Sequence, residues 1–223
     1  MMKAKRRLTR REIKEDKLVT YTYKVTDFLN KNTKLVTGVV IGLALVALIA
    51  VMMVRSKKQA EQMASAKMAE AMIYYDQMNY DKAIPIFKDI IDKYDGTHSA
   101  GFATFYLANS YFNKKEYDKA ITYYKKYLHD YGDDDLMASS SLSGIASCLD
   151  AQGKTEAAAK KFEEAARKYP KVFSAPDNLF NAALAYQKLG KKEEAKRILE
   201  EIKTKYPKAY IRDDVEMLLA KLQ

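Results

Sequence analysis

Apolar side chains after residue 60 recur at spacings that predict pairs of α-helices. In the second helix of each pair, an alanine is followed four positions later by a bulky residue and three positions after that by another apolar residue. This spacing places the three side chains on one stripe of a helix, where a neighbouring helix can cover them. The four instances begin at Ala83, Ala120, Ala158 and Ala195, which lie 37, 38 and 37 positions apart.

The first helix of each pair carries a related pattern, in which an alanine is followed three positions later by a bulky residue. Its members are Ala71/Tyr74, Ala108/Tyr111, Ala146/Leu149 and Ala183/Tyr186. Gly153 and Gly190 mark the turn inside the last two pairs, because glycine often ends a helix in a left-handed conformation. The first two pairs lack this glycine. A period of about 37 residues built from two helices is typical of a helical-repeat solenoid.

These features resemble the tetratricopeptide repeat (TPR) family. The fourth pair matches the family pattern best, at Leu179, Ala183, Tyr186, Leu189, Gly190, Ala195 and Pro207. The resemblance implies an all-α solenoid of about four helical hairpins. We place the repeats at about 64–97, 101–134, 139–172 and 176–209. A capping helix within 210–223 would cover the last repeat, with its inward residues at Val215, Leu218, Leu219 and Leu222.

A long apolar segment precedes the repeats. Residues 35–54 contain no charged side chain and lie between Lys34 and Arg55. A helix of this length covers about 30 Å, the thickness of the hydrocarbon core of a bilayer. The basic region before it is long, and neither an Ala-x-Ala site nor a cysteine follows it closely, which argues against a cleaved signal peptide and a lipoprotein. We therefore predict a single transmembrane helix that acts as an uncleaved signal anchor.

Basic residues predict the orientation of this anchor. Residues 1–34 contain 11 Lys or Arg and 4 Asp or Glu, and they carry +7 of the net charge of +10. The positive-inside rule then predicts a single-pass type II protein of the inner (cytoplasmic) membrane, with residues 55–223 periplasmic or otherwise extracytoplasmic. The twenty residues on each side of the segment contain four basic residues each. The inverted topology therefore stays open as an alternative.

Residues 17–31 carry apolar side chains at helical spacing, at Leu18, Tyr21, Val25, Phe28 and Leu29. Such a helix can lie along the cytoplasmic leaflet, with basic side chains close to anionic headgroups. The basic candidates are Arg6, Arg7, Arg10, Arg11, Lys14 and Lys17. The alternative is a solvated tail without fixed structure. Because the basic excess lies beside the apolar segment, the lipid bilayer is the expected partner of this region and nucleic acid is not.

Candidate catalytic and metal-binding residues are few. The chain has two histidines, His98 and His129, and one cysteine, Cys148. This composition excludes a Cys/His zinc set, and we expect Cys148 to be a packed core residue. Asp133–Asp135 lack the alternating ligands, the glycine and the glutamate of a calcium loop, and we expect them to cap the helix that follows. We predict a protein that is not an enzyme and has no cofactor, no metal site and no catalytic residue.

The first helices of the repeats supply the candidate binding surface. In the family register, the second, fifth, ninth and twelfth positions of each repeat face the concave side. In the first two repeats most of these positions are apolar or aromatic, which suits the recognition of apolar protein segments. The predicted groove consists of Met68, Met72, Tyr75, Phe102, Phe105, Asn109 and Phe112. The alternative is that the chain itself or a second copy covers this face, which would make the protein a homo-oligomer.

The layout of the chain combines a basic tail at 1–34, an anchor at 35–54 and a TPR domain at 55–223. Together with the Tyr-Asp-Lys-Ala-Ile element at 80–84 and 117–121, it resembles the YfgM-type ancillary subunits of the bacterial SecYEG translocon. That resemblance implies a scaffold that links the Sec translocon to periplasmic chaperones. The implied partners are translocon subunits, periplasmic chaperones or exported polypeptides.

Two other functions stay open. The Lys-Tyr-Pro endings at 168–170 and 205–207 also resemble envelope TPR scaffolds for outer-membrane assembly or cell division. The inverted topology would instead give a cytosol-facing TPR protein similar to the import receptors of organelles. Neither alternative changes the predicted fold.

Overall fold

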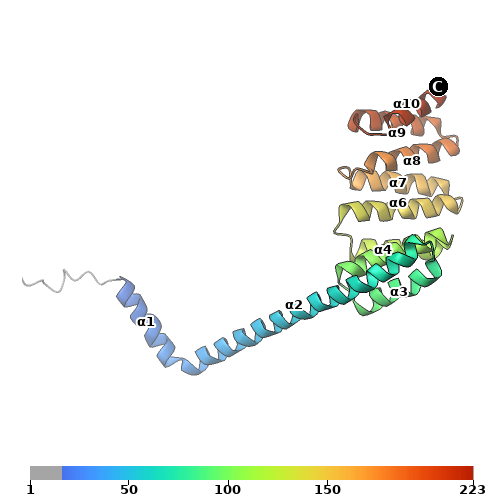
Figure 1. Cartoon of the computed structure of the whole chain (residues 1–223). Coiled ribbons are helices and arrows are strands. Elements are labelled where there is room, and N and C mark those ends of the chain that lie inside the picture. Colours follow the sequence, from blue (N-terminus) through green and yellow to red (C-terminus); the bar gives the residue numbers. More distant parts are fainter. Residues whose placement is uncertain (1–16, 223) are drawn as a thin grey trace, which may run out of the picture. The chain divides into compact units, whose positions relative to one another are not determined.

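The structure is a computed structural model, and it describes residues 17–222. Within that range the chain folds into ten α-helices and no β-strand (Figure 1). In chain order these are α1 (Lys17–Lys31), α2 (Thr33–Asp76), α3 (Tyr80–Lys93), α4 (His98–Asn113), α5 (Tyr117–Asp130), α6 (Asp135–Ala151), α7 (Thr155–Lys168), α8 (Ala175–Lys188), α9 (Lys192–Lys205) and α10 (Arg212–Leu222). The prediction of an all-helical repeat fold is confirmed.

The described part of the chain divides into two compact units, one up to Ser56 and the other from Lys57 onward, and α2 contributes to both. In the first unit, α1 has the bounds of the segment with helical apolar spacing. The rings of Tyr21 and Phe28 on α1 are 72% and 56% exposed. The basic residues expected at the headgroups, Arg6, Arg7, Arg10, Arg11 and Lys14, lie outside the described residues, as do the side chains of Lys17 and Leu18.

The apolar segment 35–54 lies within α2. Its large side chains are exposed, with Leu43 at 64% and Val46 at 65%. By length and composition, α2 is the one helix among residues 17–222 that qualifies as a membrane span. An apolar helix of this kind is stabilised by any apolar surroundings that remove its side chains from water. Anchoring in a bilayer stays a prediction.

The second unit is a stack of helical hairpins built around small residues. Figure 1 shows α6, α7, α8, α9 and α10 stacked in chain order beyond α4. Fully buried alanines lie where the two helices of a hairpin pack together and where one hairpin packs on the next. These alanines are Ala71, Ala83, Ala108, Ala120, Ala146, Ala158, Ala183 and Ala195, all with 0% exposure. They are the positions at which the sequence period predicts close helix approach, and they let neighbouring backbones come near one another.

The last helix covers the apolar face of the last hairpin. Val215, Leu218 and Leu222 of α10 are buried in the same cluster as residues of α8 and α9, and Leu219 packs against it. A terminal repeat needs such a cover, because no further repeat buries its face. Within the described residues, α10 is thus the helix that buries the apolar face of α8 and α9.

Local signals in the sequence explain several helix boundaries. The Asp134 side chain accepts a hydrogen bond of 2.9 Å from the Met137 backbone N–H, so it caps α6 as expected. Thr97 caps α4 in the same way, by accepting from Ala100 at 3.1 Å. Such caps satisfy backbone donors that have no partner within the helix.

The turns inside the hairpins share one backbone conformation, whether or not they contain glycine. Gly153 and Gly190 have φ angles of 77° and 73°. At the corresponding positions of the first two hairpins, Met78 and Lys115 have φ angles of 57° and 61°. The packing of the hairpin therefore imposes the left-handed turn even on residues with a side chain, for which it is strained.

Met78→Gly and Lys115→Gly are expected to stabilise the protein. Each relieves about 1–2 kcal/mol of backbone strain, against about 0.4–1 kcal/mol of added entropy in the unfolded chain. The net gain in free energy of unfolding is about 0.5–1 kcal/mol for each variant, measured by urea denaturation of the purified chain. Gly190→Ala is the matched control and should destabilise it. A loss of stability in both glycine variants would contradict the strain argument.

Candidate functional site

The seven residues of the predicted groove lie on α2 and α4 and differ in exposure. Phe102 is 46% exposed, and the other six are half-buried. Five of those six, all but Asn109, pack against the core cluster of the first two repeats. Asn109 accepts a hydrogen bond of 2.5 Å from the Tyr124 hydroxyl. The structure therefore brings the seven residues onto neighbouring helices, but only Phe102 presents a largely free ring.

Phe105 belongs to an aromatic cluster that joins α4 to α5. Its ring centre lies 5.6 Å from that of Tyr106 and 5.9 Å from those of Tyr124 and Tyr127, at steep angles between the ring planes. Edge-to-face contacts at these distances stabilise aromatic pairs beyond the effect of buried area. Phe105 therefore has a packing role, whatever it also contributes to a surface.

Phe102 lines a hollow of about 460 Å³, which we name the loop hollow. It is formed by the starts of α4 and α6, the end of α5 and the loops that precede α4 and α6. Its apolar and small residues are Gly96, Gly101, Phe102, Tyr127, Tyr131 and Met137. Its charged and polar residues are Lys57, Thr97, His98, Asp130, Asp133 and Asp134. The hollow thus has an aromatic floor and a mainly acidic rim.

The rim makes the loop hollow electronegative. Burial raises the pKa of Tyr127 to about 12, and the carboxylates of Asp134 and Asp133 act in the same direction. The hydrogen bonds from His129 and from Lys126, the latter of 2.6 Å, hold the pKa of Asp130 below its usual range. Asp130 is therefore charged at neutral pH, and an acidic rim favours a basic group on the ligand.

Two contacts fix the wall of the loop hollow. A Cβ atom on Gly101 would lie 3.2 Å from the ring of Tyr131, so the absence of a side chain lets that ring pack against α4. Tyr131 also donates a hydrogen bond of 2.6 Å from its hydroxyl to Asp95 in the preceding loop. A site that is already formed loses little entropy when a ligand binds.

Glu61 of α2 holds the start of α4. Its carboxylate accepts hydrogen bonds from the backbone N–H of His98 at 2.7 Å and from the N–H and hydroxyl of Ser99 at 3.2 and 2.6 Å. Burial raises the pKa of Glu61, but the hydrogen bonds from Ser99 and His98 outweigh it and bring the net pKa below the usual value. A carboxylate at a helix N-terminus is favoured by the free N–H groups and by the helix dipole.

Sequence reasoning did not identify most of the loop hollow. Tyr127, Tyr131 and Gly101 are outside the concave register of the family, and Glu61 acts on residues 37 and 38 positions away. The available signal was the set of loops that connect the repeats, which are longer than the family pattern requires. One of them carries Asp133 and Asp134 of the acidic rim.

The described residues contain neither a metal-binding cluster nor an activated thiol. Among residues 17–222, no three His, Cys, Asp or Glu side chains are placed to hold a metal ion. Burial raises the pKa of the Cys148 thiol to about 12, and its side chain is fully buried. A thiol of this kind stays protonated and is a poor nucleophile.

Comparison with known proteins gives a family match for most of the chain. Residues 26–223 match the family model described as a tetratricopeptide repeat-like domain. None of the curated proteins matches the sequence.

Solved TPR structures resemble the fold. A tetratricopeptide repeat protein from Parabacteroides merdae ATCC 43184 has a TM-score of 0.59 and 16% identity, over 72% of this chain and 60% of that chain. This chain thus spans less than two thirds of that protein. A putative kinesin light chain from Podosopora anserina gives 0.56 and 17%, over 71% and 84%. YrrB, a TPR protein with an unusual peptide-binding site, gives 0.52 and 17%, over 69% and 74%. At these identities the likeness concerns the fold alone.

Phe102→Glu and Phe105→Glu are expected to differ in stability. An exposed substitution usually changes the free energy of unfolding by about 0.5 kcal/mol, whereas a carboxylate among the three tyrosine rings should cost about 2–4 kcal/mol. Thermal melting followed by circular dichroism measures both. Phe105→Leu is the control, because it keeps the apolar contact. Equal melting midpoints for the two Glu variants would show that the contacts of Phe105 do not stabilise the fold.

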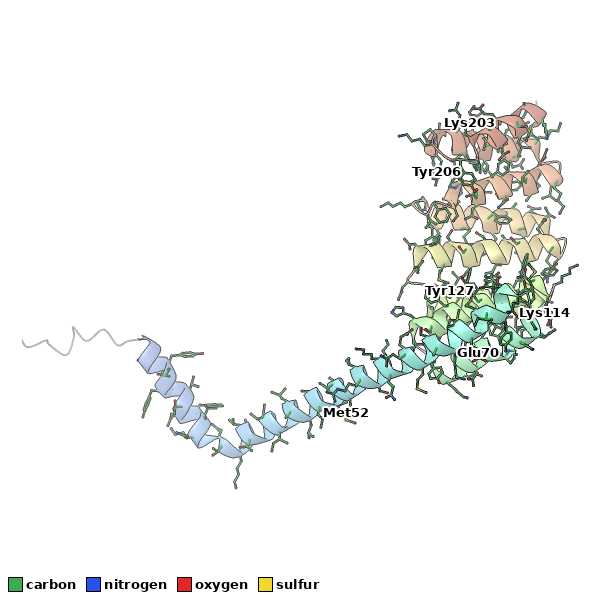
Figure 2. The ribbon with its side chains drawn as sticks, in the orientation of Figure 1. Met52, Glu70, Lys114, Tyr127, Lys203 and Tyr206 are labelled. Carbon is green, nitrogen blue, oxygen red and sulfur yellow. The ribbon has the colours of Figure 1, made fainter. Side chains whose placement is uncertain are left out.

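Glu61→Gln is expected to lower the free energy of unfolding at neutral pH by about 1 kcal/mol. Because the folded pKa of Glu61 lies below the unfolded value of about 4.3, its contribution is complete above that value and is lost as pH falls through the folded pKa. The difference between the two proteins should therefore vanish in acid. Urea denaturation from neutral pH to below the usual carboxyl range tests this. Glu70→Gln, an exposed carboxylate on the same helix (Figure 2), is the control. A Glu61→Gln penalty that is unchanged in acid would exclude the charged cap.

Proposed function

Because the chain belongs to the tetratricopeptide repeat-like domain family, we propose that it is a membrane-anchored scaffold that binds protein partners. In this proposal residues 1–34 are cytoplasmic, residues 35–54 anchor the chain in the inner membrane and residues 55–223 carry the extracytoplasmic repeat domain. The scaffold binds and positions other proteins and carries out no reaction of its own.

The loop hollow is the observation that carries the binding proposal. It joins the exposed ring of Phe102 to an acidic rim of Asp130, Asp133 and Asp134. An apolar side chain beside a lysine or arginine satisfies both features, because the floor removes apolar area from water and the rim attracts the charge. YrrB, which has a peptide-binding site, is a neighbour in fold and is consistent with recognition of a polypeptide.

The apolar segment supports the membrane proposal. Its exposed aliphatic side chains lie on a helix long enough to cross a bilayer, and a tail with a charge of +7 precedes it. The exposed rings and aliphatic side chains of α1 suit the interface between headgroups and hydrocarbon. Both features favour a membrane anchor, and the positive charge of the tail favours a cytoplasmic N-terminus.

Among envelope scaffolds we favour the link between the Sec translocon and periplasmic chaperones. The support is the order of basic tail, apolar segment and repeat domain, which is that of the YfgM-type translocon subunits. Exported polypeptides emerge unfolded, and apolar residues beside basic ones are then accessible to the loop hollow. A scaffold for outer-membrane assembly or cell division is the main alternative, and a cytosol-facing receptor is the second.

The topology is tested with protease on spheroplasts of a Gram-negative bacterium that produces the full chain. We expect the protease to digest residues 55–223 and to spare the basic tail. The control is a cytoplasmic protein, which should remain intact until the membrane is lysed. Digestion of the tail alone would exclude both the predicted topology and the translocon link.

Partner binding is tested by photo-crosslinking from position 102 in intact cells. We expect capture of translocon subunits, periplasmic chaperones or exported chains. Met217, an apolar residue of α10 that is 53% exposed, is the matched control position. Capture of outer-membrane assembly or division proteins would favour the main alternative. A product pattern identical to that from position 217 would contradict the loop hollow as a binding site.

A further inference from the structure

The four loops that connect successive repeats lie along one edge of the repeat unit. They are residues 94–97, 131–134, 169–174 and 206–211, each between the end of one hairpin and the start of the next helix. Figure 2 shows Tyr127 and Tyr206 near this edge, whereas Lys114, in the turn between α4 and α5, lies at the opposite edge. We name the surface formed by these four loops and the residues next to them the loop edge.

Contacts between neighbouring loops make the loop edge continuous. The Tyr131 hydroxyl donates to Asp95 at 2.6 Å, and the Tyr206 hydroxyl donates to the Pro170 carbonyl at 3.1 Å. A second hollow shares Asp133 and Asp134 with the loop hollow and extends over Lys171–Phe173, and a third extends from there to Lys208 and Ala209. The edge is therefore one preformed surface that crosses several repeats.

Large apolar side chains are exposed all along the loop edge. Phe102 is 46%, Leu136 42%, Phe173 73% and Tyr210 79% exposed. Exposed apolar groups that gather on one surface and have polar neighbours indicate an interaction site. Packing within one copy leaves these four side chains without a complete apolar cover.

The charge of the loop edge changes sign from the earlier loops to the later ones. The second loop region reads Tyr-Gly-Asp-Asp-Asp at 131–135, whereas the last two read Tyr-Pro-Lys followed by an apolar and an aromatic residue, at 169–173 and 206–210. Asp133, Asp135, Lys171 and Lys208 form no ion pair within the described part of the chain. The second loop region thus carries unpaired carboxylates, and the third loop carries an unpaired lysine.

We infer that the loop edge is the interface of a homodimer with two-fold symmetry. A surface with carboxylates in one loop and a lysine in the next is complementary to itself after a two-fold rotation about an axis between the two loops. Asp133 and Asp135 then face Lys171 of the partner subunit, and the exposed aromatic side chains nearby leave water. An unrelated partner would need a charge pattern that matches this surface, whereas a second copy of the chain always carries the matching pattern.

Charge reversal tests this interface in the full chain, purified in a mild detergent. One variant carries Asp133→Lys and Asp135→Lys, and the other carries Lys171→Glu. Asp134 is kept because it caps α6. Since like charges then face each other, each variant alone should self-associate at least about tenfold more weakly than the wild type. A mixture of the two should restore association, because every facing pair is again opposite in sign.

The readout is co-purification of differently tagged copies together with molar mass from light scattering. Unchanged melting midpoints show that the variants fold. Gly38 and Gly42 have the spacing that lets apolar helices pack closely in a bilayer or micelle. Association that is equally strong in all variants would come from that segment, and it overturns the inference. A monomeric wild type overturns it too. So does a mixture that fails to associate, which indicates a different occupant such as a bipolar peptide. The proposed binding of other proteins at the loop hollow is tested separately, by crosslinking from position 102.

Discussion

Close packing at the repeated alanines is the constraint on which the rest of the repeat unit depends. Ala83, Ala120, Ala158 and Ala195 have no exposed surface, and neither do the alanines at the matching positions of the first helices. An isolated hairpin of two amphipathic helices cannot bury its apolar face, so each one depends on its neighbours. Because a methyl group at these positions sets how near the helices come, it also sets the turn geometry and the place at which each loop leaves the stack. The left-handed backbone of Met78 and Lys115 is one consequence, since the hairpin closes in the same way without glycine.

Side-chain size can differ between the repeats only where a residue on the facing helix changes in size to match. The first two repeats are rich in aromatic residues, and the third contributes a helix of serines and other small residues. The two meet where the ring of Tyr124 lies over Gly144, at which a Cβ atom would be 2.4 Å from the ring. The large ring of Tyr124 on α5 therefore requires a residue without a side chain at position 144 of α6. The hydroxyl of Tyr124 is satisfied by Asn109, so the buried ring brings no unpaired polar group into the core.

The period of the sequence predicted which helices form and which alanines are buried, because both depend on local spacing. The Asp134 cap was predictable for the same reason, since donor and acceptor lie within one helical turn. Phe102 and Phe105 show the limit of this reasoning. The family register assigned both to one face, but Phe105 forms close ring pairs with Tyr124 and Tyr127 of α5, whereas Phe102 stays 46% exposed. Spacing along a helix indicates the direction in which a side chain points. It does not show which residues the side chain contacts, because those residues belong to another helix. Glu61, which caps α4 from α2, gave no local signal at all.

The acidic rim belongs to two proposed surfaces, and this overlap has a thermodynamic consequence. Asp133 and Asp134 line the loop hollow, and Asp133 also belongs to the inferred dimer interface. If a second copy places its Lys171 against these carboxylates, they are less available to a basic group of a protein partner. The two equilibria are then linked, and by reciprocity a partner that fills the loop hollow weakens the dimer by the factor by which the dimer weakens the partner. Such a scaffold would exchange self-association for partner binding without a change of fold, because the repeat packing that forms both surfaces is the same in either state.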